Sequence, residues 1–224
     1  MNLLSINQAR SVWLFPLNDL NPRGKIIERD VVSEMATRYK FAKAPDVKEI
    51  VEAREKNKGL IFADGLFKST SGEIINVTLT IYRDGLIADT RSSTIDSDNV
   101  LNEVLTWLQT DFGLLDYKSI LVNKIYLSDV FVSMARSLDI INPKFKRFAE
   151  MLTAKVKSPS APLKFEVGAL GFWIDPAQKV PQVNFRLERA EGVPFSENRY
   201  YSIAPLETEE HLNTLSELEN LLTT

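Results

Sequence analysis

The stretch IINVTLTIYRDGLIADT occupies residues 74–90 and decides the fold class. Apolar side chains stand at every second position from Ile75 to Ile81, which is the period of a β-strand with one buried face. The pair Asp84-Gly85 predicts a two-residue type I′ turn, because both residue types tolerate a positive φ. Residues 86–90 then form the returning strand, so the segment is a β-hairpin.

The neighbouring segments extend this hairpin into a meander. An apolar strand is predicted at 60–67, and a helix capped by Ser97 or Asp98 follows the hairpin, with its leucines on one narrow face. Residues 163–222 show the same order of three strands and a helix. We therefore predict an α+β fold of antiparallel β-meanders with helices packed on one face. Two similar β-β-β-α units would suggest an internal duplication, but no shared residue motif supports one, which favours two ordinary meanders.

Other elements follow from local patterns. Helices are expected at 26–41 and from Pro45 to Gly59, and a helix beginning at Asn142-Pro143 is expected to bury Phe145, Phe148, Leu152 and Val156. Strands are predicted at 12–17 and at 120–134, the second with a bend at Ser128-Asp129.

A linker with the sequence SPSAP at 158–162 is the clearest interruption of the chain. It separates an N-terminal α+β region, 1–157, from a C-terminal meander and helix, 163–224. We expect the two regions to pack as one compact unit.

Composition narrows the function classes. The 224 residues include no cysteine and one histidine, and the formal net charge is −3. The missing cysteines exclude disulfides, cysteine-ligated metal clusters and thiol chemistry. A near-neutral charge disfavours a dedicated nucleic-acid or membrane-surface protein. The N-terminus has no signal-peptide pattern and no apolar run approaches the length of a membrane span, so the expectation is a cytoplasmic protein with no membrane partner.

Motifs for catalysis are absent. The sequence contains no GxxxxGK[ST], GxGxxG or GxSxG pattern. His211 shares a helix face with leucines, which favours a core residue over a catalytic or metal-binding one, and the acids Asp84, Asp89, Asp96 and Asp98 are explained by turns and caps. No catalytic, cofactor-binding or metal-ligating residue is assigned, and no cofactor is expected. The enzymatic alternative requires carboxylates such as Asp89, Asp96 or Asp129 beside Arg91 or Arg136.

Surface anchors and a basic helix remain as candidate sites. The residues expected at a protein interface are Trp107, Trp173, Tyr200 and Leu218. The residues expected at a nucleic-acid backbone are Lys144, Lys146, Arg147, Lys155 and Lys157. Phe145 and Phe148 are expected to point into the core, away from any base. The prediction is therefore a non-enzymatic interaction subunit of a homo-oligomer or larger assembly, with nucleic-acid binding and a carboxylate enzyme as alternatives.

Overall fold

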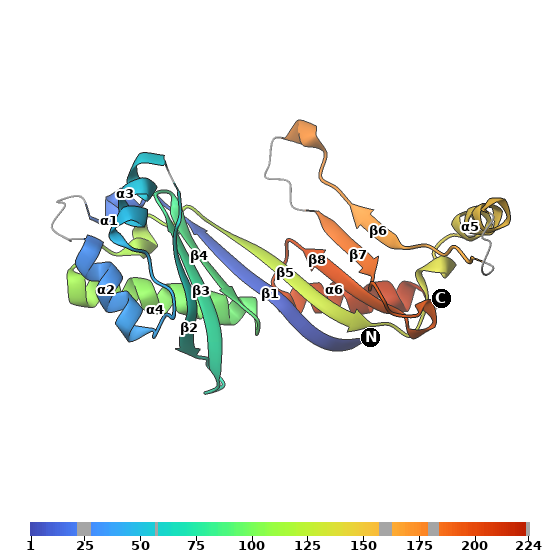
Figure 1. Ribbon diagram of the computed structural model, residues 1–224, viewed down its shortest axis with the longest axis horizontal. Helices are drawn as coiled ribbons and strands as arrows, with labels where there is room; N and C mark the ends of the chain where they lie inside the picture. The colour runs from blue at the N-terminus through green and yellow to red at the C-terminus, as the bar shows by residue number, and fades with distance from the viewer. Residues whose placement is uncertain (22–27, 57, 157–162, 179–183, 223–224) are drawn as a thin grey trace. The chain divides into compact units, whose positions relative to one another are not determined.

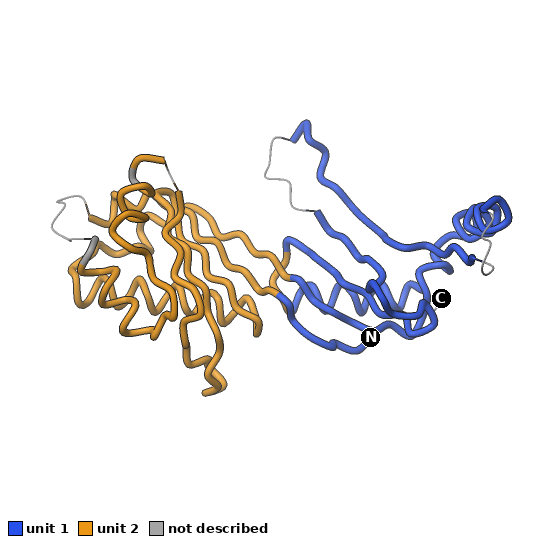
Figure 2. Tube along the Cα trace, viewed as in Figure 1, with its two compact units in different colours: residues 1–7, 129–205, 209–224 blue, residues 8–128, 206–208 orange. Residues whose placement is uncertain are grey.

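The computed structural model describes residues 1–21, 28–56, 58–156, 163–178 and 184–222 (Figure 1). Contacts divide the chain into two compact units (Figure 2). Unit 1 holds residues 1–7, 129–205 and 209–224, and unit 2 holds residues 8–128 and 206–208. The expected division at 158–162 stays a prediction, because that linker lies outside the described residues. The boundaries between the units fall after residues 7 and 128 and on either side of residues 206–208.

Eight strands within the described residues form one antiparallel sheet, in the order β2-β3-β4-β1-β5-β8-β7-β6. The strands are β1 (Asn2–Leu14), β2 (Leu60–Lys68), β3 (Ile74–Tyr82), β4 (Gly85–Thr90), β5 (Asn123–Ser133), β6 (Ala169–Phe172), β7 (Phe185–Arg189) and β8 (Arg199–Ala204). Together with the helices, this arrangement confirms the predicted α+β class.

The hairpin of β3 and β4 has the predicted strands but a different turn. Tyr82 pairs with Gly85, so the two turn residues are Arg83 and Asp84. Neither has a positive φ, which excludes the predicted type I′ turn at Asp84-Gly85. Gly85 instead begins β4, and a Cβ there would overlap the carbonyl oxygen of Trp13 in the neighbouring strand. The glycine permits close approach of two backbones rather than an unusual turn.

Unit 2 packs helices around its part of the sheet. They are α1 (Leu17–Leu20), α2 (Glu28–Arg38), α3 (Val47–Lys56) and α4 (Thr94–Phe112). Ser93, rather than Ser97 or Asp98, caps α4, because its side chain accepts a hydrogen bond from the Asp96 amide. Asp46 and Glu49 form a reciprocal capping box on α3.

The core of unit 2 joins the helices to the sheet. Leu101 and Leu105 of α4 and Met35 of α2 belong to the same buried cluster as Leu79 of β3 and Phe62 of β2. Burial of these large side chains supplies the main stabilisation of the unit. The predicted helical and strand periods therefore identify the buried faces of this unit.

Unit 1 repeats the order of elements. A meander, β6-β7-β8, is followed by α6 (Thr208–Leu221), as β2-β3-β4 is followed by α4. The first residue of α6, Thr208, belongs to unit 2 together with Thr94 at the start of α4. Within that unit the Thr94 amide donates to Thr208 Oγ1 over 3.1 Å, and the Thr208 amide donates to Thr94 Oγ1 over 2.9 Å. Leu187, Tyr200 and Leu215 form the centre of the unit 1 core.

Helix α5 (Pro143–Lys155) begins as predicted, since Asn142 caps it and Pro143 occupies its first turn. Its predicted core face is wrong. Phe145 and Phe148 are 57% and 58% exposed, and Ala149 is the buried residue of the helix. Figure 1 shows α5 standing apart from the strands of unit 1. The remaining chain of the unit covers the side of Ala149 and leaves the phenylalanines uncovered.

None of the described helices combines the length and apolar character needed to cross a membrane.

Candidate functional site

His211 is the only histidine of the chain and lies fully buried in unit 1. Its Nε2 lies 2.8 Å from Ser202 Oγ, and the ring packs edge-on against Phe185. Ser202 Oγ also donates to the Arg186 carbonyl oxygen over 3.0 Å. Because the serine proton is engaged there, His211 Nε2 carries the proton of the second hydrogen bond and donates it to Ser202.

This direction is opposite to that of a nucleophile and its base, in which the serine hydroxyl donates to the imidazole. His211 Nδ1 is buried without a hydrogen-bond partner among the described residues. Burial lowers the pKa of His211 to about 4. The pair acts as a buried polar contact between α6 and β8, in keeping with the predicted core role of the histidine.

The acidic residues Asp89 and Asp129 accept hydrogen bonds from neighbouring side chains of the fold. Arg10 holds Asp89 through two hydrogen bonds of 2.7 and 2.9 Å, and Gln8 adds a third. Asp129 accepts from Asn7 over 3.1 Å, and burial raises the pKa of Asp129. No cluster of three or more metal-ligating His, Cys, Asp or Glu residues occurs in the part of the chain that the structure describes.

Asp98 joins α4 to the sheet. Its carboxylate accepts from Trp13 Nε1 over 2.8 Å, from Lys124 Nζ over 2.8 Å, from the Tyr126 hydroxyl over 3.1 Å, and from the Ser11 hydroxyl. Burial opposes ionisation, but these donors, Lys124 first, hold the pKa of Asp98 below its ordinary value. The residue predicted as a helix cap is thus a half-buried residue inside the helix that joins it to the sheet.

A groove of about 550 Å³ lies along α4 in unit 2. Its lining includes Arg38, Lys68, Asn99, Glu103 and Trp107, so it presents both charges and an aromatic ring. The Asn99 Nδ2 is buried and lacks a partner among the described residues. The groove does not contain Asp89, Asp96 or Asp129, the acids on which the enzymatic alternative depends.

Two of the predicted interface residues are buried in their own unit. Trp107 packs edge-on against Tyr39 and Phe112, with the Arg38 guanidinium 5.3 Å from its ring centre. Tyr200 is fully buried, and its hydroxyl accepts from the Leu138 amide over 3.3 Å. Tyr200 therefore offers no accessible surface to a partner, and Trp107, 6% exposed, contributes only the small part of its ring that lines the groove.

The other two have accessible positions. Leu218 of α6 is partly buried against the unit 1 core. Trp173 directly follows β6 and is 69% exposed. Of the four predicted residues, Trp173 therefore has the largest surface free for contact with another protein.

Trp173 belongs to a larger surface formed by one face of the unit 1 strands. In β8, Tyr200 and Ser202 point to the side covered by α6, so Tyr201 and Ile203 point to the opposite side. Arg186 and Glu188 alternate with buried Leu187 in the same way. The indole of Trp173 lies over Gly171, where an added Cβ would come within 2.5 Å of the ring.

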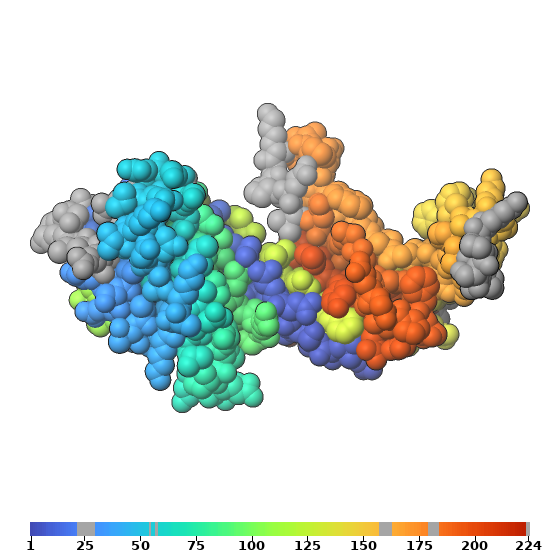
Figure 3. Space-filling view, in the orientation of Figure 1, coloured from blue at the N-terminus to red at the C-terminus, as the bar shows by residue number. Residues whose placement is uncertain are grey.

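We call this surface the open face. It comprises the exposed residues Arg186, Tyr201, Ile203 and Trp173 and the half-buried residues Phe131 and Glu188. Phe131 and Tyr201 stack with their ring centres 4.7 Å apart, and Arg186 pairs with Glu188 over 2.8 Å. Figure 3 gives the space-filling view of the unit that carries these strands. Exposed aromatic and aliphatic side chains around an ion pair have the composition of a protein interface.

The sequence analysis missed Phe131 and Tyr201 as members of this face. Both lie in strands that carry apolar side chains on both faces, so the sequence pattern could not show which face is covered by a helix. The adjacent pair Tyr200-Tyr201 was the one signal, because neighbouring strand residues point to opposite sides. The structure buries the first tyrosine and exposes the second.

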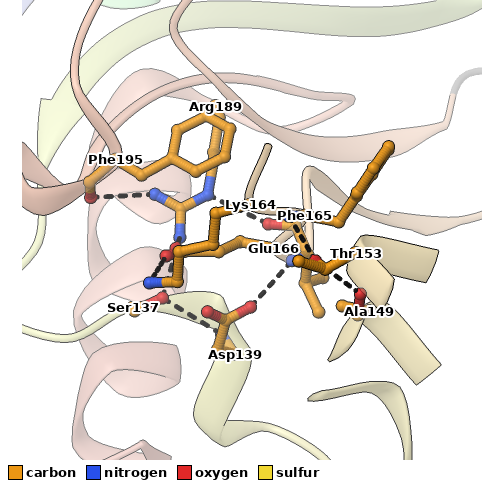
Figure 4. Close-up of polar contacts among 10 residues, drawn as sticks. Ser137, Asp139, Ala149, Thr153, Lys164, Phe165, Glu166, Arg189 and Phe195 are labelled. Carbon is orange, nitrogen blue, oxygen red and sulfur yellow. Dashed lines mark hydrogen bonds and ion pairs between the residues drawn. The ribbon is translucent and has the colours of Figure 1, made fainter. Parts of the chain in front are cut away.

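A buried arginine organises the end of unit 1 that carries α5 (Figure 4). The Arg189 guanidinium donates to the carbonyl oxygens of Val167 and Phe195, each over 3.0 Å. It also donates to Ser137 Oγ over 2.8 Å and to Glu166 Oε2 over 2.9 Å. One side chain therefore ties β7 to three separate loop segments.

These segments hold α5 by one side. Asp139 accepts from the Val167 amide over 2.7 Å, and Thr153 of α5 accepts from the Phe165 amide over 3.0 Å (Figure 4). Thr153 and Ala149 mark the side of α5 that faces the unit. The predicted basic residues of the helix, namely Lys144, Lys146, Arg147 and Lys155, are all exposed, and Lys157 lies outside the described residues.

Comparisons with known proteins find no family model and no curated protein that matches this chain.

Proposed function

We propose that this protein is a non-enzymatic interaction subunit that self-associates through the open face. The observation that carries the proposal is the aromatic surface on β7 and β8, whose other side packs against α6, together with exposed Trp173 next to it. An antiparallel sheet with one solvated face ordinarily presents polar side chains there. Trp173, Tyr201 and Phe131 instead present rings, which contribute most to binding energy at protein interfaces.

The charges of the open face favour a second copy of the chain as the partner. Arg186 and Glu188 lie two residues apart on one strand and point to the same side. In a two-fold symmetric contact, each surface meets itself in the reverse direction, so Arg186 of one copy can meet Glu188 of the other. The surface is thus complementary to itself in charge as well as apolar in character.

The placement of the other candidate groups also supports a non-enzymatic role. The Ser202–His211 pair is buried and has the wrong hydrogen-bond direction for nucleophilic attack. Asp89 and Asp98 are occupied by internal donors. The candidate groups for acid–base work thus have structural partners.

The test is the mass of the protein in solution, measured by light scattering over a range of concentrations. A dimer is expected, and Trp173→Ser should weaken it about thirtyfold or more. Phe148→Ser is the matched control, because it removes an exposed aromatic ring of the same unit outside the open face. A monomer at every concentration, or a dimer that Trp173→Ser leaves unchanged, would refute the proposal.

A charge exchange tests the orientation of the contact. Arg186→Glu and Glu188→Arg should each disrupt the homodimer by placing like charges opposite each other. Mixing the two variants should restore a dimer that contains one copy of each. Failure of the mixture to associate would show that these two residues do not meet across the interface.

A further inference from the structure

Helix α5 combines exposed apolar side chains with a concentrated positive charge. Phe145, Phe148 and Met151 are exposed, although each is a residue type that usually lies in a core. The helix carries four basic residues, Lys144, Lys146, Arg147 and Lys155, against the single acid Glu150. The chain as a whole has a net charge of −3, so this helix is a local positive region on an acidic protein.

The angular order of these side chains limits what can cover them. At about 100° per residue, the apolar arc runs from Met151 through Phe148 to Phe145, over roughly 120°. Lys144 and Lys155 project between Met151 and Phe148, inside the arc rather than opposite it. The side facing the unit, marked by Ala149 and Thr153, lies beyond Phe145.

We propose that α5 lies in the surface of an anionic phospholipid bilayer, with Phe148 and Met151 inserted and its lysines at the headgroups. A lysine inside an apolar arc suits a bilayer interface, because its long stem can follow the apolar side chains while its ammonium reaches the phosphates. The core of a protein interface, in contrast, is depleted of lysine. This contact requires no membrane-spanning helix.

The charge and the side-chain composition of α5 disfavour two other partners, a second copy of the helix and a single-stranded nucleic acid. A second copy of α5 would bring four basic residues against four, which repel each other. A single-stranded nucleic acid would use the phenylalanine rings and the lysines, but Met151 offers no ring for a base to stack on. The proposal is independent of the open face, since the two surfaces share no residue.

The experiment is cosedimentation of the full chain with phospholipid vesicles. Vesicles of phosphatidylcholine alone are compared with an equal mixture of phosphatidylcholine and phosphatidylserine, at low and at high salt. Retention is expected on the mixed vesicles at low salt, and high salt should reduce it by screening the lysines. No retention on mixed vesicles, or equal retention on both compositions, would overturn the proposal.

Variants of α5 assign the contact to this helix. The double variant Lys144→Gln with Lys155→Gln should weaken binding to mixed vesicles about 25-fold, at about fivefold for each charge near the surface. Phe148→Ser should weaken it about tenfold. Two exposed residues of other helices provide matched controls: Lys48→Gln on α3 and Leu221→Ser on α6 should leave binding unchanged.

Two further readouts keep the outcomes distinct. Circular dichroism and thermal unfolding of each variant show whether lost binding reflects lost folding. A single-stranded oligonucleotide is tested in parallel. Binding of the oligonucleotide that depends on the α5 residues, with no retention on vesicles, would overturn the lipid proposal in favour of nucleic acid. Unchanged retention of the Phe148→Ser variant would show that the helix does not insert.

Discussion

The buried histidine makes a quantitative prediction about stability and pH. In the unfolded chain His211 titrates near 6.5, whereas burial lowers its pKa in the folded protein to about 4. Protonation would place a charge in an apolar site where Nδ1 has no partner among the described residues. Between these two pKa values the unfolded chain binds more protons, so stability falls as the pH falls from 6.5 through 4.

The size of the effect follows from the two pKa values. Their separation corresponds to about 3 kcal/mol in the free energy of unfolding when the whole window is crossed. About 2 kcal/mol of this should be lost between pH 7 and pH 5. Asp98 and Glu219 have pKa values below their ordinary range, so their contributions are lost only at more acidic pH. The raised pKa of Asp129 acts in the opposite direction, since its protonated form is favoured by the fold.

Urea unfolding at a series of pH values, for wild type and for His211→Gln, isolates the histidine. Glutamine keeps an N–H group for Ser202 but does not titrate, so the difference between the two pH profiles reports the histidine alone. A proton NMR titration provides a direct check, because the one histidine of the chain needs no assignment. Equal pH profiles for the two proteins, or a titration near 6.5 in the folded protein, would refute the reasoning.

Three further predictions concern stability, each measured by urea unfolding. Thr208→Val should cost about 1–3 kcal/mol, because it leaves the buried amide of Thr94 without an acceptor, and the reciprocal Thr94→Val should behave alike; two silent variants would mean that water replaces the missing hydroxyls. Arg189→Met should cost about 3–5 kcal/mol by removing four hydrogen bonds, with little rescue by Arg189→Lys, and full rescue by lysine would show that charge alone matters. Gly85→Ala should cost about 1–3 kcal/mol through overlap with the Trp13 carbonyl, and an unchanged midpoint would contradict this close approach.

The sequence predicted those helices and strands in which the spacing of apolar residues matches the spacing of buried residues in the structure. The alternation around Val77 and Leu79 identified β3, and the asparagine and proline before α5 identified its start. For β1 (Asn2–Leu14), the apolar pattern predicted only the C-terminal part, as a strand at 12–17. Its earlier residues include Gln8 and Arg10, whose side chains are satisfied by Asp89, about eighty residues away. When the hydrogen-bond partner of a polar residue lies this far away in the sequence, the residues next to it do not indicate that it belongs to a strand.

The α5 face shows a second limit of sequence patterns. An apolar stripe on a helix indicates that burial would be favourable, but not whether the chain supplies a surface to cover it. In unit 1 the covering segment reaches Thr153 through the Phe165 amide and stops there. Phe148 therefore keeps its exposure, and the residues that the pattern assigned to the core become the candidate contact. The interface role predicted for Trp173 stays a prediction, and strand phase does not distinguish Trp173 from Phe172, since both side chains are exposed.

The two proposed surfaces of unit 1 differ in how they should respond to salt. The open face carries one cation and one anion around aromatic rings, so its contribution to association is chiefly apolar and weakly screened. Helix α5 carries four basic residues and one acid, so its attraction to a negative surface depends on ionic strength. High salt should release the protein from anionic vesicles while leaving its mass in solution unchanged. A parallel loss of both properties would mean that one surface, rather than two, carries the contacts.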